Sequence, residues 1–380
     1  MREIFVIFLR LGMIGFGGPI ALVSLIEREI CHNKKWLTLE EFAGIFSVCK
    51  LLPGPMAVQV AICCGYHKGK RWGGFVAGVG FLLPALVMII ALGILYTHHF
   101  NPNSPHLLHV FKFMQDATIA VILITLWSLG KVYVKNYSSA IIALICTALV
   151  WYLPTMEPLI ILGFGALGLI VYKTTHSDLY YFPGVIAISS TTNWLGFFKT
   201  EFIYNKLLQL FWICIKAGEF SFGTGLAILP LLHADLVTSH GWISNQQFID
   251  GLTVGQITPG PTTISIVFYG FIIAGLPGLM VALLGFYIPP MVNALFIIPL
   301  FWKKLTGSPY LRIFTMWAFP AVIGGIASAT LKLGISSITS LLDGIFLVAA
   351  LILLFKNLLP IWALIPLYGV LGLLWGYWII

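Results

Sequence analysis

Hydrophobic residues fill most of this chain in long stretches, which short polar loops separate. No acidic residue occurs in apolar runs such as 75–96, 117–129, 274–302 and 362–380. A helix that spans a membrane needs about 20 apolar residues, whereas the strands of a membrane barrel alternate apolar and polar positions. The pattern therefore predicts an all-α polytopic membrane protein.

The stretches predict about 12–13 membrane segments of this length. In the first half we expect them near residues 4–26, 42–66, 73–96, 113–132, 139–153 and 159–172, with a weaker one at 182–198. In the second half we expect them near residues 207–232, 248–273, 276–302, 314–331, 338–355 and 359–380. The weaker segment decides whether the total is odd or even.

One stretch of the chain occurs twice. Residues 12–56 and 218–262 carry the same uncommon residues in the same order, at a constant offset of 206 positions. Trp36 and Phe42 match Trp242 and Phe248, and Pro84 with Pro290 extends the offset. A constant offset through several rare residue types indicates duplication. We therefore predict two homologous halves, residues 1–198 and 199–380.

Each copy contains two places where Gly and Pro interrupt a hydrophobic segment. Proline lacks the N–H that a helix needs, so these segments should be broken helices. Broken helices from two repeats form the midplane site of many secondary transporters, and a helix N-terminus attracts anions. The candidate substrate-binding residues are Phe16, Gly17, Gly18, Pro19, Pro53, Gly54, Pro55, Phe222, Gly223, Thr224, Gly225, Pro259, Gly260 and Pro261. The alternative is that Gly and Pro only allow close helix packing.

Lys50 lies three residues before Pro53 inside an apolar segment, and its counterpart in the second copy is Gln256. A cation at membrane depth is costly unless it meets an anion or acceptors. We predict that Lys50 and Gln256 belong to the binding site, with Lys50 supplying positive charge to an anion. The alternative is a lysine that snorkels to the interface or pairs internally.

Other ionisable residues accompany the broken segments. We consider three carboxylates for coupling or ion pairing, although each is more often a structural partner: Glu219, Asp116 and Asp250. Two matched basic and acidic positions are expected to anchor the segments at the interface: Arg10 with Lys216, and Glu29 with Asp235. Two capping boxes are predicted to open the next helix of each copy: Thr38 with Glu41, and Ser244 with Gln247.

Loop charge predicts how the halves are oriented. Loop 97–112 has Lys112 as its one strong base, whereas the matching loop carries Lys303, Lys304 and Arg312. The positive-inside rule places the first loop outside and the second inside. The halves would then be inverted repeats in the inner membrane, with the N-terminus inside and segment 182–198 counted. The same bias accounts for the net charge of +8, so no nucleic-acid partner is expected.

Motifs for catalysis or cofactors are missing from the sequence. We find no nucleotide-binding loop, no HExxH motif and no nucleophile elbow, so we expect neither an enzyme nor a cofactor. A histidine-rich loop lacks a compact ligand frame, and no metal site is predicted there: His98, His99, His106 and His109.

The duplicated residues resemble the chromate ion transporter family in its long, two-domain form. In the first half the likeness rests on Arg10-Leu11-Gly12, Phe16-Gly17-Gly18-Pro19, Arg28-Glu29, Trp36-Leu37, Leu52-Pro53-Gly54-Pro55 and Gln59. In the second half it rests on Phe222-Gly223-Thr224-Gly225, Leu229-Pro230-Leu231-Leu232, Gly241-Trp242-Ile243, Phe248 and Pro259-Gly260-Pro261. The resemblance implies an exporter of chromate linked to the proton-motive force. The family pattern more often has Gln where this chain has Lys50, which puts the substrate's identity in question.

We therefore predict a secondary active transporter that exports chromate or a related oxyanion by alternating access. One alternative is a transporter of sulfate or another small anion. An alternative from another class is an intramembrane enzyme that acts on a lipid-linked anion. The expected partners are a small oxyanion and the lipid bilayer, and a homodimer is left open.

Overall fold

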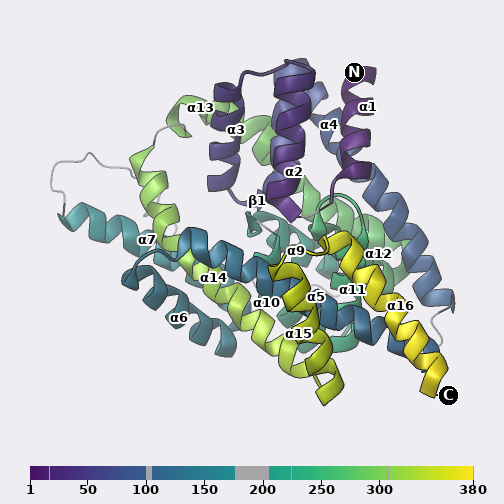
Figure 1. Cartoon of the computed structure of the whole chain (residues 1–380). Helices are drawn as coiled ribbons and strands as arrows, with labels where there is room; N and C mark the ends of the chain where they lie inside the picture. Colours follow the sequence, from purple (N-terminus) through teal and green to yellow (C-terminus); the bar gives the residue numbers. More distant parts are fainter. Residues whose placement is uncertain (17, 100–104, 176–204, 224, 306–307, 380) are drawn as a thin grey trace.

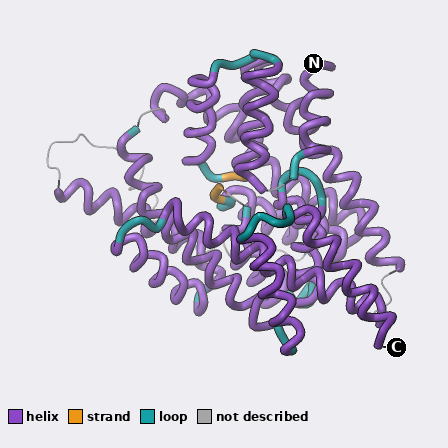
Figure 2. Tube along the Cα trace, in the orientation of Figure 1, coloured by secondary structure: helices purple, strands orange, loops and turns teal. Residues whose placement is uncertain are grey.

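The computed structural model describes residues 1–379, except 17, 100–104, 176–204, 224 and 306–307. Figure 2 shows that helices make up nearly all of this part of the chain. Five helices are long and apolar enough to cross a membrane, and four shorter apolar helices accompany them. The weaker segment at 182–198 and the predicted boundary between the halves lie outside the described residues.

The first half consists of short and long helices joined by short connections. They are α1 (Arg2–Ile14), α2 (Gly18–Glu27), the π-helix η1 (Arg28–Asn33), α3 (Leu39–Leu51), β1 (Gly54–Pro55), α4 (Met56–His99), α5 (Pro105–Tyr133), α6 (Tyr137–Tyr152), the 3₁₀ turn η2 (Pro154–Met156) and α7 (Glu157–Thr175). Both helix breaks that the sequence predicts in this half are present.

The second half repeats this order with similar lengths. Its elements are α9 (Lys206–Glu219), β2 (Phe222–Gly223), η4 (Leu226–Ile228), α10 (Leu229–His233), the π-helix η5 (Ala234–Ser239), α11 (Asn245–Ile257), η6 (Thr262–Ile264), α12 (Ser265–Val292), η7 (Asn293–Ile297), α13 (Ile298–Leu305), α14 (Pro309–Ser337), α15 (Leu341–Phe355) and α16 (Ile361–Ile379). The duplication thus extends through α14–α16, which match α5–α7.

Both predicted capping boxes are confirmed. The Thr38 hydroxyl accepts the backbone N–H of Glu41, whose carboxylate accepts the N–H of Thr38 at 2.8 Å. Ser244 and Gln247 make the same reciprocal pair at the start of α11. Each box satisfies N–H groups that the first turn of a helix leaves unpaired.

The first half opens with two helical hairpins. Lys34, after α2 and η1, pairs with Glu3 at the start of α1, so the α1 and α2 arms run antiparallel. His67 approaches Glu41 within 4.0 Å, which pairs the start of α3 with the end of the first arm of α4. An arm of 13 residues is about 20 Å long, shorter than the roughly 30 Å hydrocarbon core. These arms therefore reach only part of the way across a bilayer.

Sharp turns divide α4 and α12 into two helices each. Backbone angles leave the helical range at Gly69 and Lys70 in α4, and at Ala274 and Gly275 in α12, with nearly the same values. In α4 and α12 the offset between equivalent residues is therefore 205, one less than at the helix breaks, so Pro84 corresponds to Pro289 and the sequence-based match to Pro290 is wrong by one residue.

The two sets of hairpins meet tip to tip. Figure 1 shows α1, α2 and α3 at one end of the molecule, with their broken ends directed to β1 near the centre. There β1 pairs in parallel with β2 from the second half. Because the tips oppose each other, the arms of the two halves extend in opposite directions. The halves are inverted repeats, as the loop charges predicted.

Candidate substrate site

The four helix breaks contact one another in two equivalent pairs. Gly54 donates its backbone N–H to the carbonyl of Ser221 at 2.6 Å, and Gly260 donates to the carbonyl of Gly15 at 2.6 Å. The two hydrogen bonds exchange under the repeat offset of 206 residues. The pseudo-two-fold relation thus passes between the tips. The breaks that the sequence selected as a substrate cradle do lie together.

Backbone conformation explains why the tips need glycine. Gly54 and Gly260 have φ values of +124° and +101°, which strain any residue with a Cβ atom. A Cβ on Gly54 would also collide with the amide of Gln59. In the other breaks, Gly18 and Gly225 have positive φ as well. Two of the predicted site residues, Gly17 and Thr224, lie outside the described part of the chain.

Polar groups surround the first proline break. The carbonyl of Pro53 accepts the Gln59 amide at 2.6 Å and the Asn293 amide at 3.4 Å. Asn293 also makes a hydrogen bond with Glu219, one of the predicted coupling residues. Glu219 therefore lies beside the meeting point of the repeats.

Two buried polar atoms at this meeting point have no hydrogen-bond partner among the described residues: the side-chain oxygen of Gln59 and the hydroxyl of Ser221. Buried polar groups in folded proteins are nearly always satisfied, and exceptions call for an explanation such as an absent ligand. A hydroxyl can donate to an oxyanion. Ser221 is therefore a candidate site residue, and sequence reasoning missed it because its counterpart Gly15 carries no side chain.

Lys50 lies close to the tips but faces a separate space. It occupies the last turn of α3, half-buried, with its ammonium 5.1 Å from the ring centre of Tyr133. The space is a cavity of about 510 Å³ between α3, α5, α6 and α14. Its lining includes Lys50, Lys135, Arg312, Ser47, Asn136, Ser139 and Thr315, and none of the described residues that line it is acidic. We call this space the basic cavity.

Gln256, the counterpart of Lys50, is half-buried in α11. Gln256 is not among the residues that line the basic cavity. Lys135 and Arg312 were not selected from the sequence as binding residues. Lys135 could have been found by aligning the helix caps of the two halves. Asn136, the N-cap of α6, matches Ser340, the N-cap of α15, so the cation Lys135 stands where the second half has the neutral Thr339.

The predicted coupling carboxylates have different surroundings. Asp250 accepts hydrogen bonds from the Tyr96 hydroxyl at 2.8 Å and the Gln115 amide at 2.6 Å, which join α4 and α5 to α11. These described partners are neutral, so the contacts do not form an ion pair. Asp116 is 1% exposed, and within the described part of the chain neither of its carboxylate oxygens has a hydrogen-bond partner.

One expected interfacial anchor is instead a buried ion pair. Lys216 and Asp235 are 0% and 4% exposed, and their charged groups lie 2.9 Å apart. The sequence interpretation of these two residues as interfacial anchors is therefore wrong. Their partner charges compensate each other inside the protein, which offsets the cost of removing both from water. In the first half Arg10 is exposed, as an anchor would be.

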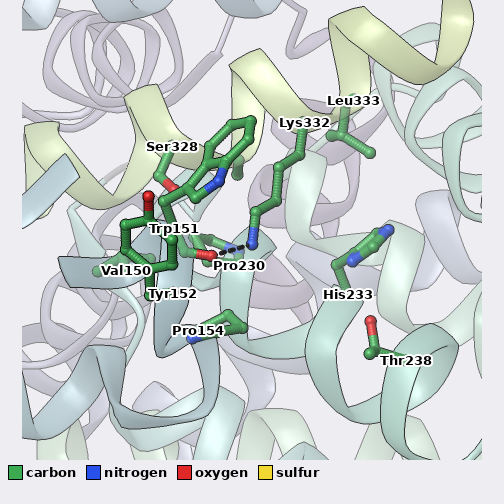
Figure 3. Close-up of a pocket in the computed structure, with 11 residues that line it drawn as sticks. Val150, Trp151, Tyr152, Pro154, Pro230, His233, Thr238, Ser328, Lys332 and Leu333 are labelled. Carbon is green, nitrogen blue, oxygen red and sulfur yellow. Dashed lines mark hydrogen bonds between the residues drawn. The ribbon is translucent and has the colours of Figure 1, made fainter. Parts of the chain in front are cut away.

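A second cavity, of about 320 Å³, lies at the far ends of α6 and α14 (Figure 3). Lys332 points into it and donates to the carbonyl of Trp151 at 2.6 Å, while His233 lies on its other side. The hydroxyl of Ser328, which also lines the cavity, is buried and finds no partner in the residues that the structure describes. Lys332 is thus a cation whose ammonium already has an acceptor.

Duplicated broken hairpins that meet inside a helical membrane protein are the architecture of many secondary transporters. Comparison with known proteins agrees. The sequence pattern of the chromate transporter family matches this chain twice, at residues 2–169 and 208–373. The chain belongs to the chromate transporter family and is a multi-pass protein of the inner membrane.

Two relatives match over most of their length. A chromate transport protein of Cupriavidus metallidurans is 32% identical, and the match covers 94% of this chain and 89% of that protein. A probable chromate transport protein of Synechococcus elongatus is 32% identical over 90% of this chain and 86% of its own length. No solved structure matches this chain.

Proposed function

We propose that this protein exports chromate, or a related oxyanion such as sulfate, by alternating access. The observation that carries the proposal is the reciprocal contact of the four helix breaks, with the unpartnered hydroxyl of Ser221 between them. Backbone that is not helical is tolerated at membrane depth only where protein or a watery cavity covers it. A polar site between two inverted repeats fits that requirement.

The hairpin tips are suited to a site that opens to each side in turn. The repeats exchange two backbone hydrogen bonds at the tips, through Gly54 and Gly260. Rocking one repeat against the other would separate the arms on one side while the tips stay in contact. Such motion about a fixed midplane site is how transporters built from inverted repeats alternate access.

The membrane potential favours export of a dianion. Moving one charge through 100 mV changes the free energy by about 2.3 kcal/mol, so two charges contribute roughly 4.6 kcal/mol. With the interior negative, the outward direction is downhill. Potential alone can therefore drive export, and inward movement of the same dianion would require coupled cations.

Ser221 offers a direct test of the site. Purified protein in vesicles should transport radiolabelled chromate, and Ser221→Ala should raise KM by about tenfold, since a hydrogen bond to a charged group contributes about 1.5–3 kcal/mol. Removing an unpartnered hydroxyl should leave the unfolding temperature unchanged or higher. An unchanged KM would remove Ser221 from the site.

Substrate choice within the oxyanions needs a competition assay on the same vesicles. If chromate is the preferred substrate, excess sulfate should inhibit its transport only at higher concentration. Stronger inhibition by sulfate would make chromate a mimic of the true substrate.

A further inference from the structure

We propose that Lys50, Lys135 and Arg312 form a loading site for a small tetrahedral oxyanion on the cytoplasmic side. The inference rests on the proposed transport function and concerns a step before the anion reaches the hairpin tips. The basic cavity has a floor and a rim. Lys50 is half-buried near the first proline break, whereas Lys135 and Arg312 are exposed.

The chemistry of the basic cavity fits an anion. Of the described residues that line it, three are cations and none is a carboxylate, while Asn136 and Ser139 add neutral donors. The ion pairs found in the described chain do not include Lys50, Lys135 or Arg312. Like charges that share a space repel one another, and a dianion between them would relieve the repulsion. A volume of about 510 Å³ holds a small hydrated oxyanion.

Two stacked aromatic rings form the floor of the basic cavity. Tyr133, on which the Lys50 ammonium rests, stacks on Phe319 with ring centres 4.4 Å apart and planes at 18°. The two rings join the end of α5 to α14. Lys50 is thereby held at the inner end of the cavity, in the turn that precedes the Pro53 break. An anion that reached Lys50 would stand next to the tips.

The cavity lies towards the end of the molecule that carries the outer turns of the first-half hairpins. The ring of Trp302 in α13, which precedes α14, packs against Gly44 of α3. Arg312 follows in the first turn of α14. Figure 1 shows α13 beside α3 at the end where the N-terminus lies.

Positive charge assigns this end to the cytoplasm. The outer turns of the first-half hairpins contain five basic residues: Lys34, Lys35, Lys68, Lys70 and Arg71. The matching turns of the second half, residues 239–242 and 273–276, contain no Lys or Arg. Under the positive-inside rule the first set faces the cytoplasm. The basic cavity therefore collects anions from the compartment that an exporter empties.

The cations of the basic cavity have no basic counterparts at the equivalent positions of the other repeat. The repeat sets Lys50, Lys135 and Ser139 against Gln256, Thr339 and Asp343. On that opposite side Asp343 is paired with Lys112 at 3.2 Å. At equivalent places in the two repeats, the first therefore carries cations that form none of the described ion pairs, and the second carries the ion pair Lys112–Asp343. The asymmetry favours anion loading from the cytoplasm and release outside.

The cavity with Lys332 is a weaker candidate for binding an anion than the basic cavity. Lys332 lies at the far end of the parallel pair α6 and α14, and its ammonium donates to Trp151 (Figure 3). That cavity holds one lysine with an acceptor, against the three cations of the basic cavity. We therefore locate the loading site in the basic cavity alone.

Transport kinetics from each face test the proposal. In inside-out vesicles, external radiolabelled chromate meets the cytoplasmic face. There the double variant Lys135→Gln/Arg312→Gln should raise KM by about tenfold, equivalent to about 1.4 kcal/mol, because two exposed cations that attract the anion are lost. The maximal rate should stay within about twofold, and KM should depend less on salt. In right-side-out vesicles KM should not change.

Matched variants separate charge from structure. Lys131→Gln removes one exposed cation from the same end of α5, outside the cavity, and should leave KM unchanged. The charge-retaining variant Lys135→Arg/Arg312→Lys should keep KM near the wild-type value. Equal changes in KM at both faces, or an effect no larger than that of Lys131→Gln, would overturn the loading site.

A phosphate headgroup of an anionic lipid shares the chemistry of the soluble oxyanion. Reconstitution in purely zwitterionic lipid distinguishes the two sources. The proposal expects the KM difference between the wild type and the double variant to persist there. If the difference disappears, the cavity binds a headgroup and the proposal is wrong. If the wild type moves no chromate in any vesicle, the proposed transport function fails first.

Discussion

Gly54 and Ser221 are 167 positions apart in the chain, yet the N–H of Gly54 donates to the carbonyl of Ser221 at 2.6 Å. The same bond recurs between Gly260 and Gly15. Four interruptions in four helices are therefore one structure, made where the tips of opposed hairpins touch. At each proline break the other repeat accepts the freed glycine N–H, as membrane depth requires of non-helical backbone.

Replacing Gly54 at the hairpin tip by alanine should destabilise the protein, whereas the same change at a glycine in an ordinary helix should not. Gly54→Ala places a Cβ against the Gln59 amide at a φ of +124°. We expect the free energy of unfolding to fall by about 1–3 kcal/mol and transport to be lost. Gly344→Ala is the control, because no atom lies within 4 Å of its Cβ position in α15. It should raise the unfolding temperature. Measured thermal unfolding of Gly54→Ala equal to the wild type would contradict the tip geometry.

The buried pair Lys216–Asp235 should stabilise the second hairpin only as a pair. Lys216→Met leaves a buried carboxylate without its cation, and we expect a loss of about 3–5 kcal/mol. The double variant Lys216→Met/Asp235→Leu removes both charges and should recover most of that stability. Denaturation in detergent of the wild type, the single variants Lys216→Met and Asp235→Leu, and the double variant gives the coupling energy. If the double variant is as unstable as the sum of the single variants, the pair has no such coupling.

Substitution of the two buried aspartates should affect stability differently. Asp250→Ala leaves the Tyr96 hydroxyl and the Gln115 amide without an acceptor, at a cost of about 1–3 kcal/mol each. Asp116→Asn loses no hydrogen bond and should fold as well as the wild type. Unfolding temperatures measure both effects. We expect Asp116→Asn to alter proton dependence of transport if Asp116 is a coupling residue, and a wild-type pH profile would exclude that role.

Lys50→Gln gives the first half the residue of the second half. The described contact of the Lys50 ammonium is with the ring of Tyr133, so stability should change by less than about 1 kcal/mol. Chromate KM should rise, and Lys50→Arg should keep it low because the charge remains. Vesicle uptake under a fixed potential measures this series. Equal KM values for Lys50→Gln and the wild type would exclude Lys50 from the anion path.

Regular features of the fold could be predicted from the sequence. The offset between the copies identified the breaks, and Thr38 with Glu41 marked a helix start correctly, because caps and breaks are local chemistry. Hairpin depth could not be predicted, since hydropathy does not distinguish an arm of about 20 Å from a full span. The contact of Gly54 with Ser221 also depends on how the repeats pack.

The candidate site was predictable in part. The breaks were found because Pro and Gly are rare in that arrangement. Lys135 and Arg312 were missed because each lies in a polar stretch, where a basic residue needs no explanation. Only the fold brings them to Lys50. Lys216 was misassigned since its partner Asp235 is on another arm of the hairpin.

Chromate uptake by inside-out vesicles that contain only this purified protein tests the central claim most directly. An imposed potential that is positive inside the vesicle drives the anion in the export direction. The account predicts that radiolabelled chromate accumulates, that accumulation increases with the potential, and that it is weakened in Lys50→Gln at low chromate concentration. Absence of potential-dependent accumulation in the wild type would contradict it.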